Sequence, residues 1–107
     1  MRYALKNDRY SPSVKPLIAK VKRVLPFLVK QYHIKSLGVF GSYLRNEQSS
    51  GSDLDVLVEF SKTPSLLRFI ELENRLTDLL GIRVDLVMKD TLKPAIGKHI
   101  LREVISV

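Results

Sequence analysis

The sequence contains no cysteine, which excludes disulfide bonds and zinc sites built on thiolates and is typical of proteins from a reducing compartment. No apolar run approaches the roughly 20 residues that a helix needs to cross a bilayer. The opening residues, MRYALKNDRY, lack the apolar segment of a secretory signal. Internal repeats and low-complexity tracts are also missing. Together these absences predict a soluble, cytoplasmic protein.

Acidic residues are scarce in the first third of the chain, where Asp8 is the only one before residue 36. The formal net charge of the whole chain is +7. A basic balance favours anionic partners such as nucleotides, nucleic acid or acidic protein surfaces, although basic side chains also simply keep a surface solvated. Composition leaves both interpretations open. The cations that crowd the first 35 residues are Arg2, Lys6, Arg9, Lys15, Lys20, Lys22, Arg23, Lys30 and Lys35.

The length of 107 residues and a hydrophobic content of 45% suit one compact domain, which we expect to span residues 13–107 after an irregular arm over residues 1–12. Apolar periodicity and turn residues predict the order helix, strand, loop, strand, helix, strand, helix and edge strand. This order indicates an α+β fold, a small mixed sheet of three to four strands with helices packed on one face. The predicted elements are a helix over 16–32, strands over 37–40, 53–60 and 82–88, a helix over 63–80, a short helix from 94 and an edge strand in 104–107.

Local signals refine these boundaries. Pro26 interrupts the apolar face of the first helix, and proline removes a backbone hydrogen bond, so a kink or break is expected there. Thr63 followed by Pro64 predicts the start of the second helix, and Gly81 predicts its end. Residues 43–45 are expected to form a single helical turn.

The feature that carries chemistry is a pair of aspartates, Asp53 and Asp55, on one face of the strand over 53–60. Alternate residues of a strand point the same way, so their carboxylates repel unless a cation lies between them. Magnesium prefers carboxylate oxygens and keeps positions open for phosphates. Asp85 lies in the next strand, and it completes a site of three carboxylates if the two strands are neighbours. The sequence therefore predicts a magnesium site at Asp53, Asp55 and Asp85.

A Gly-Ser pair ten residues upstream of the aspartates can supply the phosphate-binding end of the site. Gly41 lets the backbone approach a ligand closely, and Ser42 offers a hydroxyl donor where a helical turn begins. Arg45 can reach the same anion and bind it through two nitrogens. The candidate nucleotide-binding residues are Gly41, Ser42, Arg45 and Ser52.

These residues resemble the motif of a known family. The segment GSYLRNEQSSGSDLDVLV resembles the G-S-x10-D-x-D signature of the DNA polymerase beta-like nucleotidyltransferase superfamily, and the resemblance covers about residues 17–107. The length, the VDLV segment and the LKPAIGKHILREVI ending are similar to the minimal nucleotidyltransferase branch. Members of that branch are commonly antitoxin partners of HEPN-domain RNase toxins, and some transfer AMP from ATP onto a tyrosine of the toxin.

The resemblance implies a role for each matching residue. Gly41 and Ser42 would contact the triphosphate, Asp53 and Asp55 would bind two magnesium ions, and Asp85 would bind the catalytic ion and help to activate the attacking hydroxyl. Arg45 matches the arginine that usually follows Gly-Ser. The branch often has Ala-Arg-Gly where this chain has Leu44-Arg45-Asn46, and Asn46 is expected to replace the glycine because asparagine tolerates left-handed backbone geometry.

The implied reaction is attack of a hydroxyl on the α-phosphate of ATP, with pyrophosphate leaving. No histidine is needed as a base, so His33 and His99 are expected at structural or surface positions, and Phe40 in the core. Two alternatives to adenylyl transfer onto a toxin remain. The chain could neutralise a toxin by binding alone, or it could transfer nucleotides to RNA ends, as the basic first helix would allow. No membrane partner is expected.

Overall fold

The computed structural model describes residues 14–49 and 51–107, so the predicted arm over residues 1–12 lies outside the described residues. Four strands form one mixed sheet in the order β3-β2-β1-β4. Strand β1 pairs antiparallel with β2 and β4, and β2 pairs parallel with β3. The elements are α2 (Lys15–Tyr32), β1 (Ile34–Phe40), β2 (Leu54–Phe60), α3 (Leu66–Leu80), β3 (Val84–Met88), the 3-10 helix η1 (Lys89–Thr91), α4 (Pro94–Glu103) and β4 (Ile105–Ser106).

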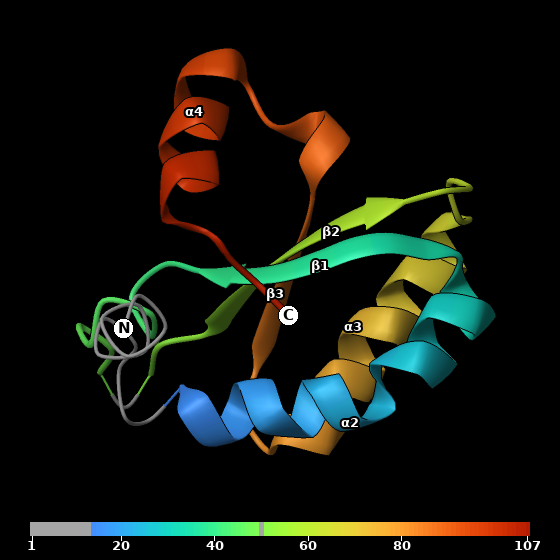
Figure 1. The fold of residues 1–107 in the computed structure, drawn as a ribbon, viewed down its shortest axis with the longest axis horizontal. Helices are drawn as coiled ribbons and strands as arrows, with labels where there is room; N and C mark the ends of the chain where they lie inside the picture. Colours follow the sequence, from blue (N-terminus) through green and yellow to red (C-terminus); the bar gives the residue numbers. More distant parts are fainter. Residues whose placement is uncertain (1–13, 50) are drawn as a thin grey trace, which may run out of the picture.

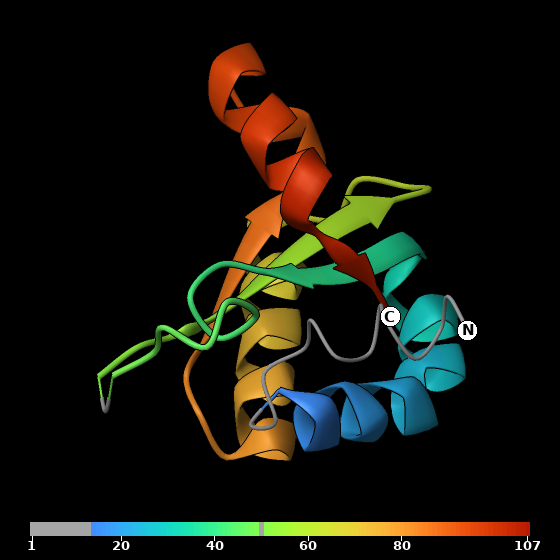
Figure 2. The same cartoon turned by 60° about the vertical axis from the view of Figure 1, so that its left-hand side comes forward.

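The sheet separates two apolar layers of unequal size. Helices α2 and α3 lie side by side against one face, where they enclose the main core, and the short α4 stands on the opposite side (Figures 1 and 2). On that side Ile100 packs on Phe40 and Leu57. The predicted α+β fold with a small mixed sheet is confirmed. Helices α2 and α3 pack on one face as expected, whereas α4 adds a partial layer on the other face. Among residues 14–49 and 51–107, no helix is long and apolar enough to span a bilayer.

Strand β2 owes its orientation to strict alternation. Leu54, Val56 and Val58 are at most 2% exposed and face α2 and α3. Because side chains alternate along a strand, Asp55 and Leu57 must face the other way. The burial pattern confirms the two faces predicted from the sequence, and it turns the acidic face of β2 away from the main core.

Helix α2 continues through Pro26 and ends at Tyr32. Its C-cap is His33, which has a left-handed backbone (φ 57°) and donates its N–H to the carbonyl of Val29. The ribbon of α2 changes direction in its second half (Figure 2), so the proline kinks the helix without breaking it. Strand β1 begins directly after this cap at Ile34, three residues earlier than the apolar run predicted. His33 and His99 are both exposed, as expected of residues with no catalytic task.

The start of α3 differs from the sequence prediction. The helix begins at Leu66, and its N-cap is Ser65, whose hydroxyl accepts the backbone N–H of Arg68 at 3.2 Å. The prediction of Thr63 as the cap was therefore wrong, because Thr63-Pro64 and Ser65 offer competing start signals and only Ser65 lies three residues before a free helical amide. Gly81 ends the helix with φ 73°, as predicted.

Replacing Ser65 by alanine should lower the free energy of unfolding by about 1 kcal/mol, because the amide of Arg68 loses its partner. Urea unfolding monitored by circular dichroism measures this difference. The matched control is Thr63→Ala, which should leave stability unchanged because Thr63 lies outside the helix. Equal effects of the two substitutions would contradict the assignment of Ser65 as the cap.

Helix α3 also covers the outer edge of β3, the last strand on that side of the sheet. The Thr77 hydroxyl accepts the N–H of Val84 at 3.1 Å, and a carboxylate oxygen of Glu73 accepts the N–H of Leu86 at 2.8 Å. Both amides would otherwise lack a strand partner, and a buried unpaired amide costs about 1–3 kcal/mol. The two side chains therefore fix β3 against α3 and with it the position of Asp85.

Candidate active site

The parallel pairing of β2 and β3 brings two of the predicted acidic residues together. Asp55 lies opposite Asp85 in the register, and Asp53 stands one residue before β2. The N–H of Leu54 donates to the carbonyl of Arg83 at 2.9 Å, which fixes the starts of the two strands against each other. Asp55 and Asp85 therefore leave the sheet side by side on the face opposite α2 and α3, and Asp53 joins them by alternation.

Gly41 follows β1 at the same end of the sheet and lies against Asp55. Phe40 is paired with Asp55 in the register, and Gly41 turns the chain with φ 86°. A Cβ atom at Gly41 would come within 2.0 Å of Oδ2 of Asp55. Only glycine allows this contact, because any side chain would occupy the space of the carboxylate. The structure thus joins the Gly-Ser segment to the acidic pair, as the sequence spacing predicted.

The segment after Gly41 is compact, and the predicted helical turn over residues 43–45 forms as a single turn that does not continue into a helix. The carbonyl of Gly41 accepts the N–H groups of Leu44 at 3.1 Å and Arg45 at 3.2 Å. Asn46 then takes a left-handed conformation with φ 60°, which stops the turn before a helix can propagate. Asn46 therefore does replace the glycine of the related pattern. Leu44 is the first residue whose amide donates to the Gly41 carbonyl. Ser42 precedes it and therefore lies in the first part of this turn, the position of the first residues of a helix.

Ser52 shapes the loop that leads into β2. Its hydroxyl accepts the N–H of Ser49 at 2.9 Å, and its own N–H donates to the carbonyl of Ser49 at 3.0 Å. These two bonds close a small turn directly before Asp53. Through these two bonds, Ser52 fixes the backbone of the loop that leads into Asp53 and β2.

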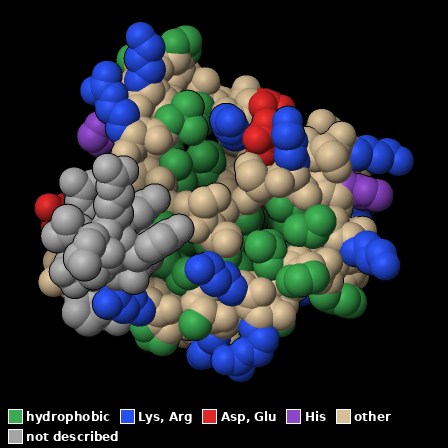
Figure 3. All heavy atoms as spheres, in the orientation of Figure 1, with side chains coloured by type: hydrophobic (Ala, Val, Ile, Leu, Met, Phe, Trp, Pro, Cys, Tyr) green, Lys and Arg blue, Asp and Glu red, His purple; other side chains and the backbone are tan. Residues whose placement is uncertain are grey.

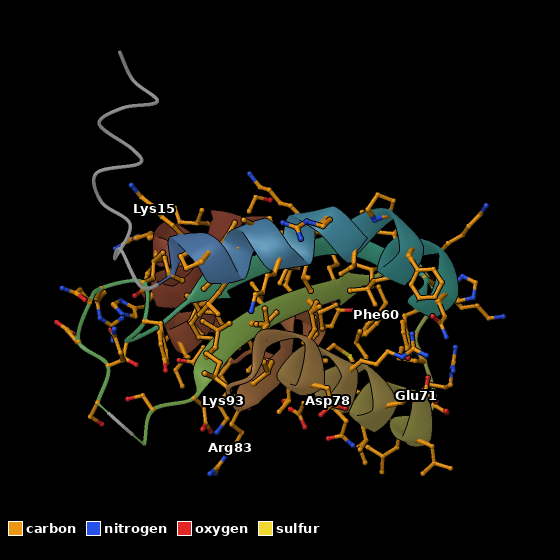
Figure 4. The ribbon with its side chains drawn as sticks, turned by 90° about the horizontal axis from the view of Figure 1, so that it is seen from below. Lys15, Phe60, Glu71, Asp78, Arg83 and Lys93 are labelled. Carbon is orange, nitrogen blue, oxygen red and sulfur yellow. The ribbon has the colours of Figure 1, made fainter. Side chains whose placement is uncertain are left out.

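Two charged residues that sequence reasoning did not select border the carboxylates. Arg83 places Nε 3.5 Å from Oδ1 of Asp53 while remaining 78% exposed, and Figure 4 shows its side chain extending outward from the ribbon. Glu103, at the end of α4, pairs with Arg45, which also binds Glu47 at 2.8 Å. The alternation of β3 places Arg83 on the face of Asp85, but no local pattern reveals Glu103, which is 58 residues from Arg45 in the sequence.

The electrostatics of the site centre on Asp55. Partial burial, then the nearby carboxylates of Asp85, Asp53 and Glu103, raise the pKa of Asp55 from 3.8 to about 6, while the Arg45 guanidinium acts in the opposite direction. The shift means that the folded protein disfavours a negative charge at Asp55. The molecule as a whole is basic, and Lys and Arg side chains are spread over the face drawn in Figure 3. The acids around Asp55 are therefore a local exception.

Metal-free protein should lose stability as the pH rises from 3.8 through about 6. The folded state binds the Asp55 proton more tightly than the unfolded state, so this contribution is complete below the unfolded pKa and is lost above the folded pKa. Solvent screening of this partly exposed group reduces the effect to about 1 kcal/mol. Urea unfolding in a chelator at about pH 4 and about pH 7 would measure it, with Asp55→Asn as the reference. If the difference in stability between the wild type and Asp55→Asn did not change with pH, the raised pKa of Asp55 would be contradicted.

The donor set suits a hard divalent cation, since carboxylate oxygens are the ligands that magnesium prefers. Repulsion among Asp53, Asp55 and Asp85 is also what a bound cation would relieve. Within residues 14–49 and 51–107, no group of three or more His, Cys, Asp or Glu side chains is yet arranged as a set of metal ligands. The backbone register nevertheless places the three acids on a shared face of the sheet.

Comparison with known proteins gives the family. The model of the nucleotidyltransferase domain matches residues 18–107. The chain belongs to the nucleotidyltransferase domain family. It is 55% identical over 80 residues to the protein adenylyltransferase MntA of Thermococcus cleftensis, which covers 75% of this chain and 81% of that protein. The family model and this relative therefore agree that the chain is a nucleotidyltransferase.

Solved structures agree with this family. One, described as a "putative minimal nucleotidyltransferase", shares 37% identity and a TM-score of 0.75, over 88% of this chain and 95% of that one. Another contains an AMPylated HEPN toxin of Shewanella oneidensis with its MNT antitoxin, and a chain of it matches with 20% identity and a TM-score of 0.63, over 84% of this chain and 70% of that one. The nucleotidyltransferase fold is thus shared well beyond the range of clear sequence similarity.

Proposed function

We propose that this nucleotidyltransferase uses magnesium to transfer AMP from ATP to a tyrosine hydroxyl of a HEPN-domain toxin, and that it acts in this way as an antitoxin. The observation that carries the proposal is the register of β2 and β3, which sets Asp55 beside Asp85 next to the backbone of Gly41. The adenylyltransferase relative from Thermococcus cleftensis and the AMPylated toxin of the Shewanella complex support the transferred group and the partner.

In the proposed reaction, the tyrosine oxygen forms a bond to the α-phosphorus, the bond from that phosphorus to the bridging oxygen breaks, and pyrophosphate leaves. Magnesium held by Asp53, Asp55 and Asp85 would neutralise phosphate charge and lower the pKa of the attacking hydroxyl. Asp85 takes up the hydroxyl proton. The backbone at Gly41 and the hydroxyl of Ser42 hold the triphosphate, so the protein acts mainly by positioning groups and stabilising charge.

The test combines the purified chain, a HEPN-domain toxin, ATP and magnesium chloride, followed by intact mass measurement of the toxin. The expected result is a mass gain of one or more AMP units, which disappears with Asp53→Asn and with Asp55→Asn. Asp78→Asn is the matched control, because Asp78 is an exposed acid of α3 that lies away from the acidic face (Figure 4) and should leave transfer unchanged.

Two outcomes would reject the proposal in favour of the alternatives. Tight inhibition of the toxin without a mass gain would identify an antitoxin that acts by binding alone. Elongation of a labelled RNA oligonucleotide, with the toxin unmodified, would identify transfer to RNA ends.

A further inference from the structure

Arg45 is held from two sides by acids of different elements. Its Nε donates to Glu47 at 2.8 Å within the turn after β1, and its Nη1 pairs with Glu103 at the end of α4. The two acids differ in exposure, since the Glu47 side chain is 62% exposed and the Glu103 side chain is 14% exposed. Of the two acids, Glu103 is the more shielded from solvent, so its contact with Arg45 is less screened than the contact with Glu47.

The position of Glu103 is unfavourable on local grounds. The last turn of a helix carries a partial negative charge, which repels an acidic side chain. Glu103 ends α4, and it also adds to the repulsion felt by Asp55. A carboxylate that opposes both the helix dipole and its acidic neighbours needs a compensating partner, and Arg45 is the partner that the structure provides.

The backbone that carries Glu103 is firmly attached to the sheet. The next residue, Val104, packs so closely over Gly38 that a Cβ atom at Gly38 would lie 2.6 Å from it. Strand β4 then pairs with β1, with Ile105 opposite Val39. Glu103 therefore starts from a fixed point, and its carboxylate can hold Arg45 in one orientation.

We propose that Glu103 is a positioning residue that orients Arg45 toward the triphosphate of the bound nucleotide. This inference rests on the proposed function. With Nε directed to Glu47 and Nη1 to Glu103, the guanidinium still carries the two N–H donors of Nη2 for a phosphate oxygen. A long, flexible arginine loses conformational freedom when it binds a ligand, and a side chain already ordered by Glu103 loses less.

The sign of one substitution separates this role from a simple charge effect. Removing a carboxylate near a polyphosphate would by charge alone strengthen nucleotide binding. If Glu103 orients Arg45, Glu103→Gln should instead weaken binding of the non-hydrolysable analogue AMP-PNP with magnesium by about fivefold. The same variant should raise the KM for ATP by a similar factor and leave kcat nearly unchanged, because the reacting carboxylates stay in place.

The matched control is Glu59→Gln. Glu59 is also an ion-paired acid of low exposure (22%), bound to Lys35 and Lys89 on the same face of β2 but toward the other end of the strand. This control should bind AMP-PNP as the wild type does. A second series in an Arg45→Ala background tests the mechanism, since Glu103→Gln should no longer weaken AMP-PNP binding once Arg45 is gone, and only the charge effect, which favours binding, should remain.

Three results would overturn the inference: unchanged binding in Glu103→Gln, tighter binding in Glu103→Gln, or a loss that persists in the Arg45→Ala background. If the wild type bound neither ATP nor AMP-PNP, the proposed function itself would fail. Wild-type transfer with normal binding by Glu103→Gln would reject only the role of Glu103.

Discussion

Gly41→Ala should reduce adenylyl transfer by about 100-fold and lower the free energy of unfolding by about 1–3 kcal/mol. The added Cβ would lie 2.0 Å from Oδ2 and 2.9 Å from Cγ of Asp55, so the carboxylate or the turn must move. Alanine is also disfavoured at a φ of 86°. Displacing Asp55 by even about 1 Å removes it from its position opposite the phosphates, which is why activity should suffer more than stability.

Gly81→Ala separates the backbone effect from the collision. Gly81 also has a positive φ, at 73°, but a Cβ atom there would meet nothing within 4 Å. This control should lose about 1 kcal/mol of stability from backbone strain and keep full activity. Transfer rates measured by toxin mass and unfolding curves for both variants give the comparison. Normal activity in Gly41→Ala would show that the contact between Gly41 and Asp55 is not required.

Asp55→Asn should lower the transfer rate by on the order of 10³-fold while making the metal-free protein more stable. Activity falls because the central carboxylate of the proposed metal site is lost. Stability rises because the folded protein disfavours a charge at Asp55, whose pKa is raised to about 6 by burial and by the acids around it. After allowance for solvent, the gain near pH 7 is about 1 kcal/mol.

The opposite signs of these two effects are the diagnostic result, because a variant that merely unfolds loses both. Asp78→Asn, an exposed acid on α3, should change neither quantity. Magnesium should also raise the melting temperature of the wild type and not that of Asp55→Asn, since a ligand that binds only the folded state stabilises it. A stabilised but fully active Asp55→Asn variant would remove Asp55 from the proposed site.

Much of the fold and the grouping of the site follows from periodicity. The alternation in β2 assigned Leu54, Val56 and Val58 to the core and Asp55 to the opposite face, and the structure has this arrangement. The expectation that Asp85 lies beside that strand also holds, since β2 and β3 are neighbours in parallel register. These predictions succeed because a strand with one buried face allows only one orientation of its side chains.

Other features depend on contacts that no short segment contains. The start of α3 shifted because two helix-start signals lie two residues apart, and the helix uses Ser65. The expected helical turn after Ser42 forms, and it ends after one turn because Asn46 adopts positive φ. The pairing of Arg45 with Glu103 joins residues 58 positions apart, and it exists only once α4 has folded back onto the sheet. Such a contact cannot be predicted from local patterns, because it depends on how distant segments pack together.

The hydrogen bonds from Val84 and Leu86 to Thr77 and Glu73 have a consequence for association with other chains. An open strand edge invites an incoming strand, and this is a common route both to complexes and to aggregation. Here side chains of α3 already occupy those amides at one border of the sheet, and the opposite border is the two-residue strand β4. Docking by strand addition is therefore disfavoured at the β3 edge, where an incoming strand would have to displace the Thr77 and Glu73 side chains.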